Sequence, residues 1–237
     1  MKTKSNNPTA MLVLWDIDGT LMTTSGAGSA AFLEAGRELF GERFRLDGVD
    51  QLGRLDSVIW RDAAKVSRVE DPDESEIKFR AVYLNCYKYR LVSEPAACVL
   101  FPGVVDLIDR LEKQDHVIQG LLTGNYPEIG RMKLEIAGFD LRLFPVRAWG
   151  SDARTRPDLV PVALSRLREF NGTVLDSKQV LIIGDTPRDV NCARENGCRS
   201  LGVATGKFSR QALEEAGADI AVDDLADVEA ILDWIIH

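Results

Sequence analysis

The stretch LWDIDGTLMTTSGAG, residues 14–28, joins an apolar segment to two carboxylates and then to a glycine-rich run. Residues 11–15 are all apolar, which is typical of a buried strand of a parallel sheet. Asp16 and Asp18 follow at once, and a Gly-Thr pair comes directly after them. Two negative charges at the end of a buried strand indicate either a site for a cation or a phosphate, or a solvated turn.

A calcium-binding loop is one alternative for two aspartates at this spacing. Such a loop needs glycine at its sixth position and glutamate at its twelfth. Counted from Asp16, those positions are Leu21 and Ala27, so the calcium loop is excluded. The choice between a turn and a functional site therefore depends on what the rest of the chain places nearby.

Strands and helices alternate along the second half of the chain. Further apolar runs typical of buried strands are 117–122, 180–183, 199–204 and 219–222. Helical spacing of apolar residues is found in 104–113, 127–137, 159–170, 188–196, 210–216 and 225–236. This alternation predicts an α/β fold built on a doubly wound, Rossmann-like parallel sheet.

One interval is too long for a simple strand–helix–strand crossover. About a hundred residues separate the first strand from the next clear one, several times the length of such a crossover. Within this interval, apolar residues recur at three-and-four spacing in 27–39, 56–65 and 74–91. We therefore expect a helical cap domain over residues 25–97, inserted into an α/β core formed by residues 1–24 and 98–237.

Polar residues follow three of the predicted strands at their carboxyl ends. Besides Asp16 and Asp18, they are Thr123, Gly124 and Asn125 after residues 117–122, and Asp185 and Asp189 after residues 180–183. In open α/β sheets, ligands bind beyond the carboxyl ends of the strands. We expect these residues from three separate segments to meet at one rim of the sheet.

The chemistry of this predicted rim suits a metal ion and a phosphate. Crowded carboxylates raise one another's pKa unless a cation lies among them, and hard oxygen ligands are those that Mg²⁺ prefers. The turn at residues 123–125 leads into a helix, whose N-terminus attracts anions. A phosphate also needs a strong cation, which Arg154 or Arg156 can supply. The set is that of a metal-assisted phosphoryl-transfer site.

Four segments carry these residues in order: DIDGTL (16–21), LLTGN (121–125), an arginine before a helix at Arg156, and IIGDTPRD (182–189). Together they resemble the motifs of the haloacid dehalogenase superfamily, and the chain is most similar to its phosphoglycolate-phosphatase-like branch. The resemblance implies a small helical cap after the first motif, in agreement with the long interval above. It also implies a phosphomonoester hydrolase that uses Mg²⁺ and forms an aspartyl-phosphate.

The same resemblance implies a role for each motif residue. Asp16 would be the nucleophile, and Asp18 would protonate the leaving oxygen and then activate the hydrolytic water. Arg156 would neutralise the phosphate and the nucleophile. The residues implied to hold Mg²⁺ are Asp16, Asp18 through its carbonyl, Asp185 and Asp189. The residues implied to bind the phosphoryl group are Thr123, Gly124 and Asn125.

Two positions depart from related patterns. Most family members carry lysine where Arg156 stands, but arginine keeps its charge at every working pH and can bind a phosphate through two donors. Arg156 is preferred to Arg154 for its spacing to the helix at Leu159. The dehalogenating members of the superfamily lack the second aspartate. Asp18 therefore favours a phosphatase, because an alkoxide leaving group needs a proton that a halide does not.

Several alternatives remain open at this point. A phosphomutase of the same fold would return the phosphoryl group to a sugar, and a non-catalytic phosphate-binding protein would not need Asp18. GAGSAA, residues 26–31, matches a dinucleotide fingerprint, but lies too far beyond the first strand and is better interpreted as the entry to the cap. In the predicted cap, Arg54 of GRLD could contact the non-phosphate half of an anionic substrate, or could be a surface residue.

Composition narrows the classes of function. The net charge is −8 and no long basic run occurs, so a nucleic-acid partner is not expected. No apolar stretch approaches the ~18 residues of a membrane span, and the apolar run near the N-terminus is too short for a signal peptide. The four cysteines form no C-x-x-C pair, which favours reduced thiols. We expect a cytoplasmic monomer or homodimer that acts on a small phosphorylated metabolite.

Overall fold

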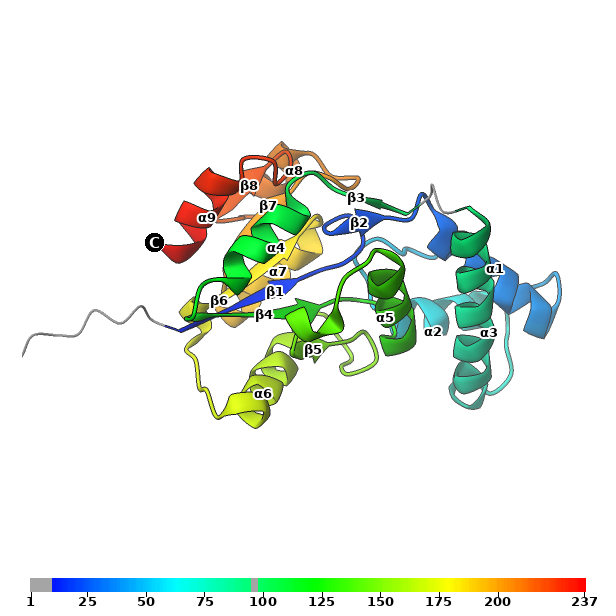
Figure 1. The fold of residues 1–237 in the computed structure, drawn as a ribbon. Helices are drawn as coiled ribbons and strands as arrows, with labels where there is room; N and C mark the ends of the chain where they lie inside the picture. The colour runs from blue at the N-terminus through cyan, green and yellow to red at the C-terminus, as the bar shows by residue number, and fades with distance from the viewer. Residues whose placement is uncertain (1–9, 95–97) are drawn as a thin grey trace, which may run out of the picture.

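Strand β1 (Met11–Trp15) lies inside a six-stranded parallel sheet in the computed structural model, which describes residues 10–94 and 98–237 (Figure 1). The strand order is β5-β4-β1-β6-β7-β8. The other strands are β4 (Val117–Leu122), β5 (Val146–Ala148), β6 (Val180–Gly184), β7 (Arg199–Val203) and β8 (Ile220–Val222). All five pairings within this sheet are parallel, and the predicted doubly wound α/β fold is confirmed.

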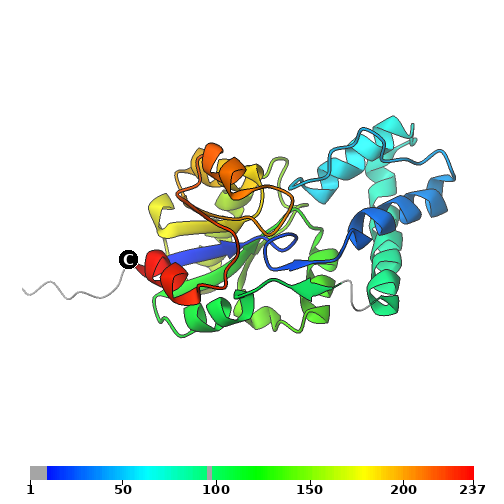
Figure 2. The ribbon, with the colours of Figure 1, turned by 90° about the horizontal axis from the view of Figure 1, so that it is seen from above.

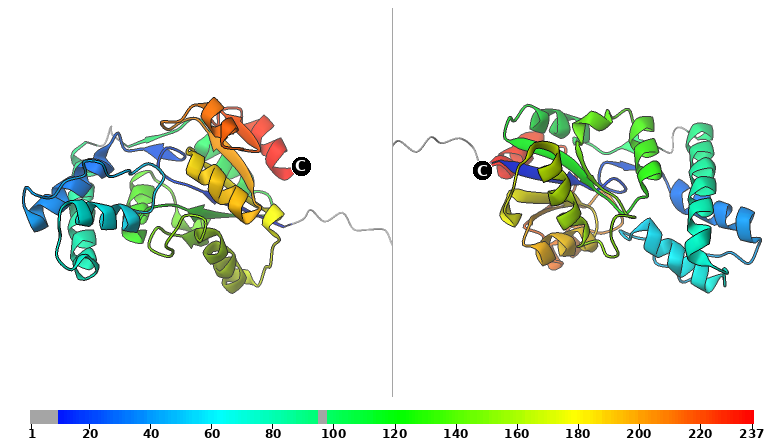
Figure 3. Two further views of the ribbon diagram at one scale, coloured as in Figure 1. Left: turned by 180° about the vertical axis from the view of Figure 1, so that it is seen from behind. Right: turned by 90° about the horizontal axis from the view of Figure 1, so that it is seen from below.

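Side chains of β1 alternate between two layers of helices. Val13 and Trp15 pack with α4 (Val104–Glu112) and α9 (Val228–Ile236). Leu12 and Leu14 pack on the other face with α6 (Leu159–Asn171) and α7 (Pro187–Asn196), which face the reader in the left view of Figure 3. The short helix α8 (Arg210–Glu215) lies against β7 and β8. Both faces of the sheet are covered, which is why β1 is apolar throughout rather than alternating.

The connection order sets the position of the site. From β1 the chain continues to β4 and β5 on one side of the sheet, and then crosses to β6, β7 and β8 on the other. The carboxyl ends of β4, β1 and β6 are therefore neighbours at a topological switch point, where ligands bind in sheets of this kind.

Three helices lie apart from the sheet, beyond the carboxyl ends of its strands (Figure 2). They are α1 (Ala27–Phe40), α2 (Asp56–Val66) and α3 (Pro72–Ser93). Their shared core is aromatic, with the rings of Trp60 and Phe79 stacked at 4.2 Å between centroids. Ile129 and Met132 of α5 (Pro127–Ile136) belong to the same cluster, so these three helices pack directly on the core.

Four details differ from the sequence-based expectations. The edge strand β5 was not predicted, because its three residues include Arg147 and form no apolar run. Strands β2 (Met22–Thr23) and β3 (Val99–Leu100) were not predicted either, because two residues are too few to display a period; they pair in antiparallel fashion where the chain leaves the core and returns to it. The last helix begins at Val228 rather than Leu225, because Asp227 accepts from the backbone N–H of Ala230 as its N-cap. Residues 95–97 lie outside the described chain, and the cap boundaries stay predictions.

Candidate active site

Asp16 is the first residue beyond β1 and the centre of the site. Its backbone N–H donates to the carbonyl of Ile183 at 3.0 Å, which continues the pairing of β1 with β6 by one residue. Its side chain is almost completely buried. Burial raises the pKa of Asp16 to about 6; the neighbouring Arg156 lowers it and Asp189 raises it.

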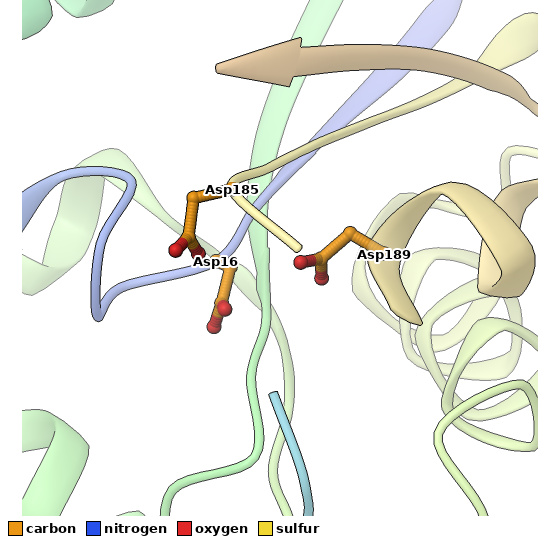
Figure 4. A group of neighbouring side chains, drawn as sticks. All are labelled: Asp16, Asp185 and Asp189. Carbon is orange, nitrogen blue, oxygen red and sulfur yellow. The ribbon is translucent and has the colours of Figure 1, made fainter. Parts of the chain in front are cut away.

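Asp185 and Asp189 direct their carboxylates toward Asp16 (Figure 4). One oxygen from each of these three residues lies within 4.8 Å of the others. Asp185 follows β6, and Asp189 is in the first turn of α7, where its Oδ2 accepts from Thr186 as part of a capping box. Each carboxylate is buried. Residues that follow β1 and β6 thus lie together with a residue from the first turn of α7.

The acidic cluster fits a divalent metal ion. Burial, with Asp189 and Asp16 nearby, raises the pKa of Asp185 to about 9, so Asp185 resists ionisation unless a further cation binds beside it. The backbone approaches Asp185 closely at Gly19 and Gly206, where an added Cβ would lie 2.2 and 1.7 Å from Oδ2. Asp189 offers fewer free lone pairs than Asp16 and Asp185, because both of its oxygens already accept hydrogen bonds.

Arg156 contacts Asp16 from the loop before α6. Its Nη2 lies 2.9 Å from Asp16 Oδ2 and also donates to Asp189 Oδ1, and its side chain is 5% exposed. Arg154, the alternative that sequence alone left open, is exposed. Arg156 Nε is buried and has no partner among the residues that the structure describes. An unpaired buried donor is destabilising by about 1–3 kcal/mol, and a bound anion would offer it an acceptor.

Thr123 and Asn125 follow β4 on the other side of β1. Thr123 Oγ1 accepts from Asn125 Nδ2 at 2.8 Å, so the hydroxyl keeps its own proton to donate. Gly124 lies between them, where an added Cβ would be 2.1 Å from the carbonyl of Arg54. The turn therefore offers the Thr123 hydroxyl as a hydrogen-bond donor. At Gly124 the neighbouring backbone leaves no room for a side chain.

Asp18 is held by a residue that the sequence analysis did not identify. Lys133 of α5 donates to both carboxylate oxygens of Asp18, at 2.8 and 2.6 Å, and to Asn125 Oδ1 at 2.6 Å. The available signal was a lysine on the buried face of an amphipathic helix, four residues after Ile129. Burial lowers the pKa of Lys133, but the charge on Asp18 more than offsets this and raises it above its ordinary value.

Asp56 was also missed, and it joins the cap to the core. Its Oδ2 accepts from the backbone N–H of Tyr126 at 2.8 Å, while its own N–H donates to the carbonyl of Gly124 at 2.7 Å. Ser57 Oγ donates to the carbonyl of Gly150 at 2.7 Å. Burial raises the pKa of Asp56 to about 7. Hydrogen bonds thus join the N-terminus of α2 to the turn that follows β4.

A cavity of about 390 Å³ lies between cap and core. Its core side carries the predicted metal and phosphate residues other than Asp189, and its cap side includes the aromatic rings of Phe32, Tyr83 and Tyr87. Arg54 also lines it, but is paired with Asp62 at 2.8 Å. The glycine-rich stretch enters α1 through Gly26, whose φ of 84° is the left-handed conformation that glycine adopts most easily. The cavity is sized for a small molecule.

A buried acidic cluster with a paired arginine, at the strand ends of a parallel sheet and beneath a helical cap, defines a class of capped α/β enzymes. Residues 13–203 match the family of haloacid dehalogenase-like hydrolases. The chain belongs to this family.

Similar proteins support the same assignment. The chain is 27% identical over 228 residues to a protein described as "Probable phosphatase IndB" from Dickeya dadantii, covering 92% of this chain and 91% of that one. It is 25% identical over 225 residues to a phosphoglycolate phosphatase from Pseudomonas putida, covering 90% and 76%. The crystal structure of a hydrolase from Pseudomonas syringae shares the fold, with a TM-score of 0.71 and 21% identity over 96% of this chain and all of that one.

These relatives and the family match identify the chain as a phosphoester hydrolase of the phosphoglycolate-phosphatase-like branch. Within residues 10–94 and 98–237, no helix is both long and apolar enough to cross a membrane.

Proposed function

We propose that the chain is a Mg²⁺-dependent phosphatase that hydrolyses small phosphorylated metabolites through an aspartyl-phosphate on Asp16. The observation that carries this proposal is the meeting of Asp16 and Asp185, at the ends of β1 and β6, with Arg156 from the loop before α6, beside the cavity between cap and core. A buried carboxylate that contacts a cation and lines the cavity is placed to attack a phosphorus atom.

The first half of the proposed reaction transfers the phosphoryl group to the protein. A carboxylate oxygen of Asp16 attacks phosphorus, and the bond from phosphorus to the leaving oxygen breaks. The leaving oxygen keeps the bonding electrons and takes a proton from Asp18, which is 46% exposed and reaches the cavity. Arg156 and the Thr123 hydroxyl stabilise the negative charge on the transferring group.

The second half releases phosphate. Asp18, now a carboxylate, accepts a proton from a water molecule whose oxygen attacks phosphorus. The bond between phosphorus and Asp16 breaks, which regenerates the Asp16 carboxylate. The same residue therefore gives a proton in one step and takes one in the next.

Mg²⁺ would be held by the carboxylates of Asp16 and Asp185, with the Asp18 carbonyl and Asp189 completing the protein ligands. Bound there, it would neutralise charge on the phosphoryl oxygens. The fit rests on hard oxygen ligands, on the raised pKa values of Asp16 and Asp185, and on the close backbone approach at Gly19.

A reducing compartment such as the cytoplasm is proposed on the basis of the cysteines. Cys86, Cys98, Cys192 and Cys198 are all free thiols in the structure. Free, largely buried thiols are usual where proteins are kept reduced.

Phosphate release from p-nitrophenyl phosphate tests the proposal. The purified protein is expected to turn over with Mg²⁺ and to stop when the metal is chelated. Turnover in excess chelator would contradict the metal's role. Conversion of a sugar phosphate to an isomer without free phosphate would indicate a mutase, and phosphate binding without turnover would indicate a non-catalytic protein.

A further inference from the structure

Lys133 is a buried cation on a helix that otherwise serves packing. The buried residues of α5 include Ile129, Met132 and Leu134, and the side chain of Lys133 is only 4% exposed. Lysine stems usually let the ammonium group reach water. Here the ammonium group is turned inward, toward the site.

Three acceptors surround the ammonium group, one for each of its protons. They are both carboxylate oxygens of Asp18 and the amide oxygen of Asn125, all within 2.8 Å. A fully coordinated ammonium group has no donor left for a substrate in this arrangement. Its contacts are with other site residues, which points to a role in holding them.

Lys133 also determines how Asn125 faces its neighbours. With Oδ1 on the ammonium group, Nδ2 of Asn125 is directed to Asp18 Oδ2 at 2.8 Å and to Thr123 Oγ1 at 2.8 Å. Asp18, Asn125 and Lys133 thus form a closed ring of hydrogen bonds. Lys133 therefore orients two groups. One is the Asp18 carboxylate, which transfers protons in the proposed reaction, and the other is the Asn125 amide, which donates to the Thr123 hydroxyl.

The cap covers the remaining side of the ammonium group. The ring of Tyr87, on α3, lies 5.0 Å from Nζ, within the range of a cation–π contact. The Tyr87 hydroxyl is hydrogen-bonded to Thr24 Oγ1 at 2.7 Å, which fixes the ring. Gly28 leaves room for it, since an added Cβ there would be 2.9 Å from the hydroxyl oxygen.

We propose that Lys133 is a positioning residue that fixes the orientation of Asp18 and Asn125, and that Tyr87 makes this orientation depend on the seated cap. This inference rests on the proposed phosphatase function. It assigns Lys133 no contact with the substrate and no bond-making step.

Leaving-group dependence distinguishes this role from a structural one. An alkyl phosphate needs a proton on its leaving oxygen when the bond to phosphorus breaks, whereas p-nitrophenolate leaves readily without one. The ratio kcat/KM includes only the steps through formation of the aspartyl-phosphate, so slow hydrolysis of that intermediate does not mask the effect. Misorientation of Asp18 should therefore lower kcat/KM much more for the alkyl ester.

The experiment measures kcat/KM for an alkyl phosphate and for p-nitrophenyl phosphate in Lys133→Met, Lys133→Arg and wild-type protein. In Lys133→Met, the loss for the alkyl ester should exceed the loss for the aryl ester by about tenfold or more. Lys133→Arg should recover part of the difference. Lys78→Met, which makes the same change at an exposed position of α3, should match wild type for both esters.

A double-mutant cycle adds a second readout. If Lys133 acts through Asp18, Lys133→Met should have little further effect on the alkyl ester in an Asp18→Asn background. Equal losses for both esters, no recovery with arginine, or additive effects in the cycle would overturn the proposal.

Two further variants keep the test decisive if Lys133→Met does not fold. Tyr87→Phe retains the ring over the ammonium group, and Tyr87→Leu removes it; only the latter should show the selective loss. Failure of the proposed function itself looks different, because wild-type protein would then be inactive or Asp16→Asn fully active. An inactive Asp16→Asn together with unselective losses at Lys133 would reject this inference alone.

Discussion

The cavity has a floor formed by the core and a roof formed by the cap, and different features of the fold position the residues of each. The floor consists of residues directly after β1, β4 and β6, where the backbone of a parallel sheet fixes their positions. The roof consists of Asp56 and Ser57 at the start of α2 and of Tyr87 on α3; Lys133 of the core helix α5 contacts both levels, through Asp18 and through Tyr87. The order of the strands determines where the floor residues lie, whereas the packing of the helices determines where the roof residues lie. We therefore expect the floor to carry the reaction and the roof to adjust it.

The largest effect should come from the floor. Asp16→Asn removes the attacking carboxylate and keeps the side chain's shape, so turnover should fall by at least about a thousandfold. Phosphate release and thermal unfolding should be measured together, to show that the fold is retained. Asp109→Asn, the same change on the exposed side of α4, is the control and should be fully active. A normal rate in Asp16→Asn would show that Asp16 is not the nucleophile.

Asp185→Asn tests the proposed Mg²⁺ site in the floor of the cavity. A neutral amide is a weaker ligand than a carboxylate, so the Mg²⁺ concentration for half-maximal activity should rise by about tenfold or more. Titration of activity with Mg²⁺ gives this value directly. An unchanged Mg²⁺ dependence, with or without lower activity, would show that Asp185 is not a ligand.

The raised pKa values of the floor predict a pH dependence of stability. Without metal, the native state keeps protons on Asp16 and Asp185 up to pH values near 6 and 9, whereas an unfolded aspartate loses its proton near pH 3.9. The native state binds more protons, so the free energy of unfolding should decrease as the pH rises from about 5 to 9. Mg²⁺ should reverse this, since it replaces those protons.

Thermal unfolding across this pH range, with and without Mg²⁺, checks the prediction. At a Mg²⁺ concentration a hundredfold above the Kd at about pH 9, the stabilisation there should approach about 2.7 kcal/mol, or roughly 5–10 °C in Tm, and the same concentration should stabilise less at lower pH, where protons compete. Asp185→Asn should flatten both curves. A Mg²⁺ effect that is independent of pH would contradict the assignment.

The smallest effect should come from the roof. Ser57→Ala removes the hydrogen bond from α2 to the carbonyl of Gly150, which is worth about 0.5–1.5 kcal/mol. A loosened cap should raise KM a few-fold with little change in kcat. A thousandfold loss of kcat in this variant would show that roof and floor are not distinct in function.

The same division explains how much the sequence could predict. Asp16, Thr123 and Asp185 follow apolar runs that are recognisable as strands, and the rule for strand ends brings them together. Arg154 and Arg156 are two residues apart in one loop, so only the packed chain shows which of them reaches Asp16. Lys133 was missed because a lysine in an amphipathic helix usually faces water.

The fold shows a similar limit. Strands β1, β4, β6 and β8 were found because each is a continuous apolar run or nearly so, although β8 has only three residues. Strands β2, β3 and β5 have two or three residues, and exist because neighbouring segments supply their hydrogen bonds. Such strands are a property of the tertiary structure rather than of local sequence.

The central claim is that Asp16 carries the phosphoryl group, and trapping that intermediate tests it most directly. Protein mixed with substrate and Mg²⁺ should be quenched in acid, digested and analysed by mass spectrometry. We expect one phosphoryl group on the peptide that contains Asp16, in greater amount in Asp18→Asn, where hydrolysis of the intermediate is slowed. A phosphoryl group on any other residue, or none in either protein during active turnover, would contradict it.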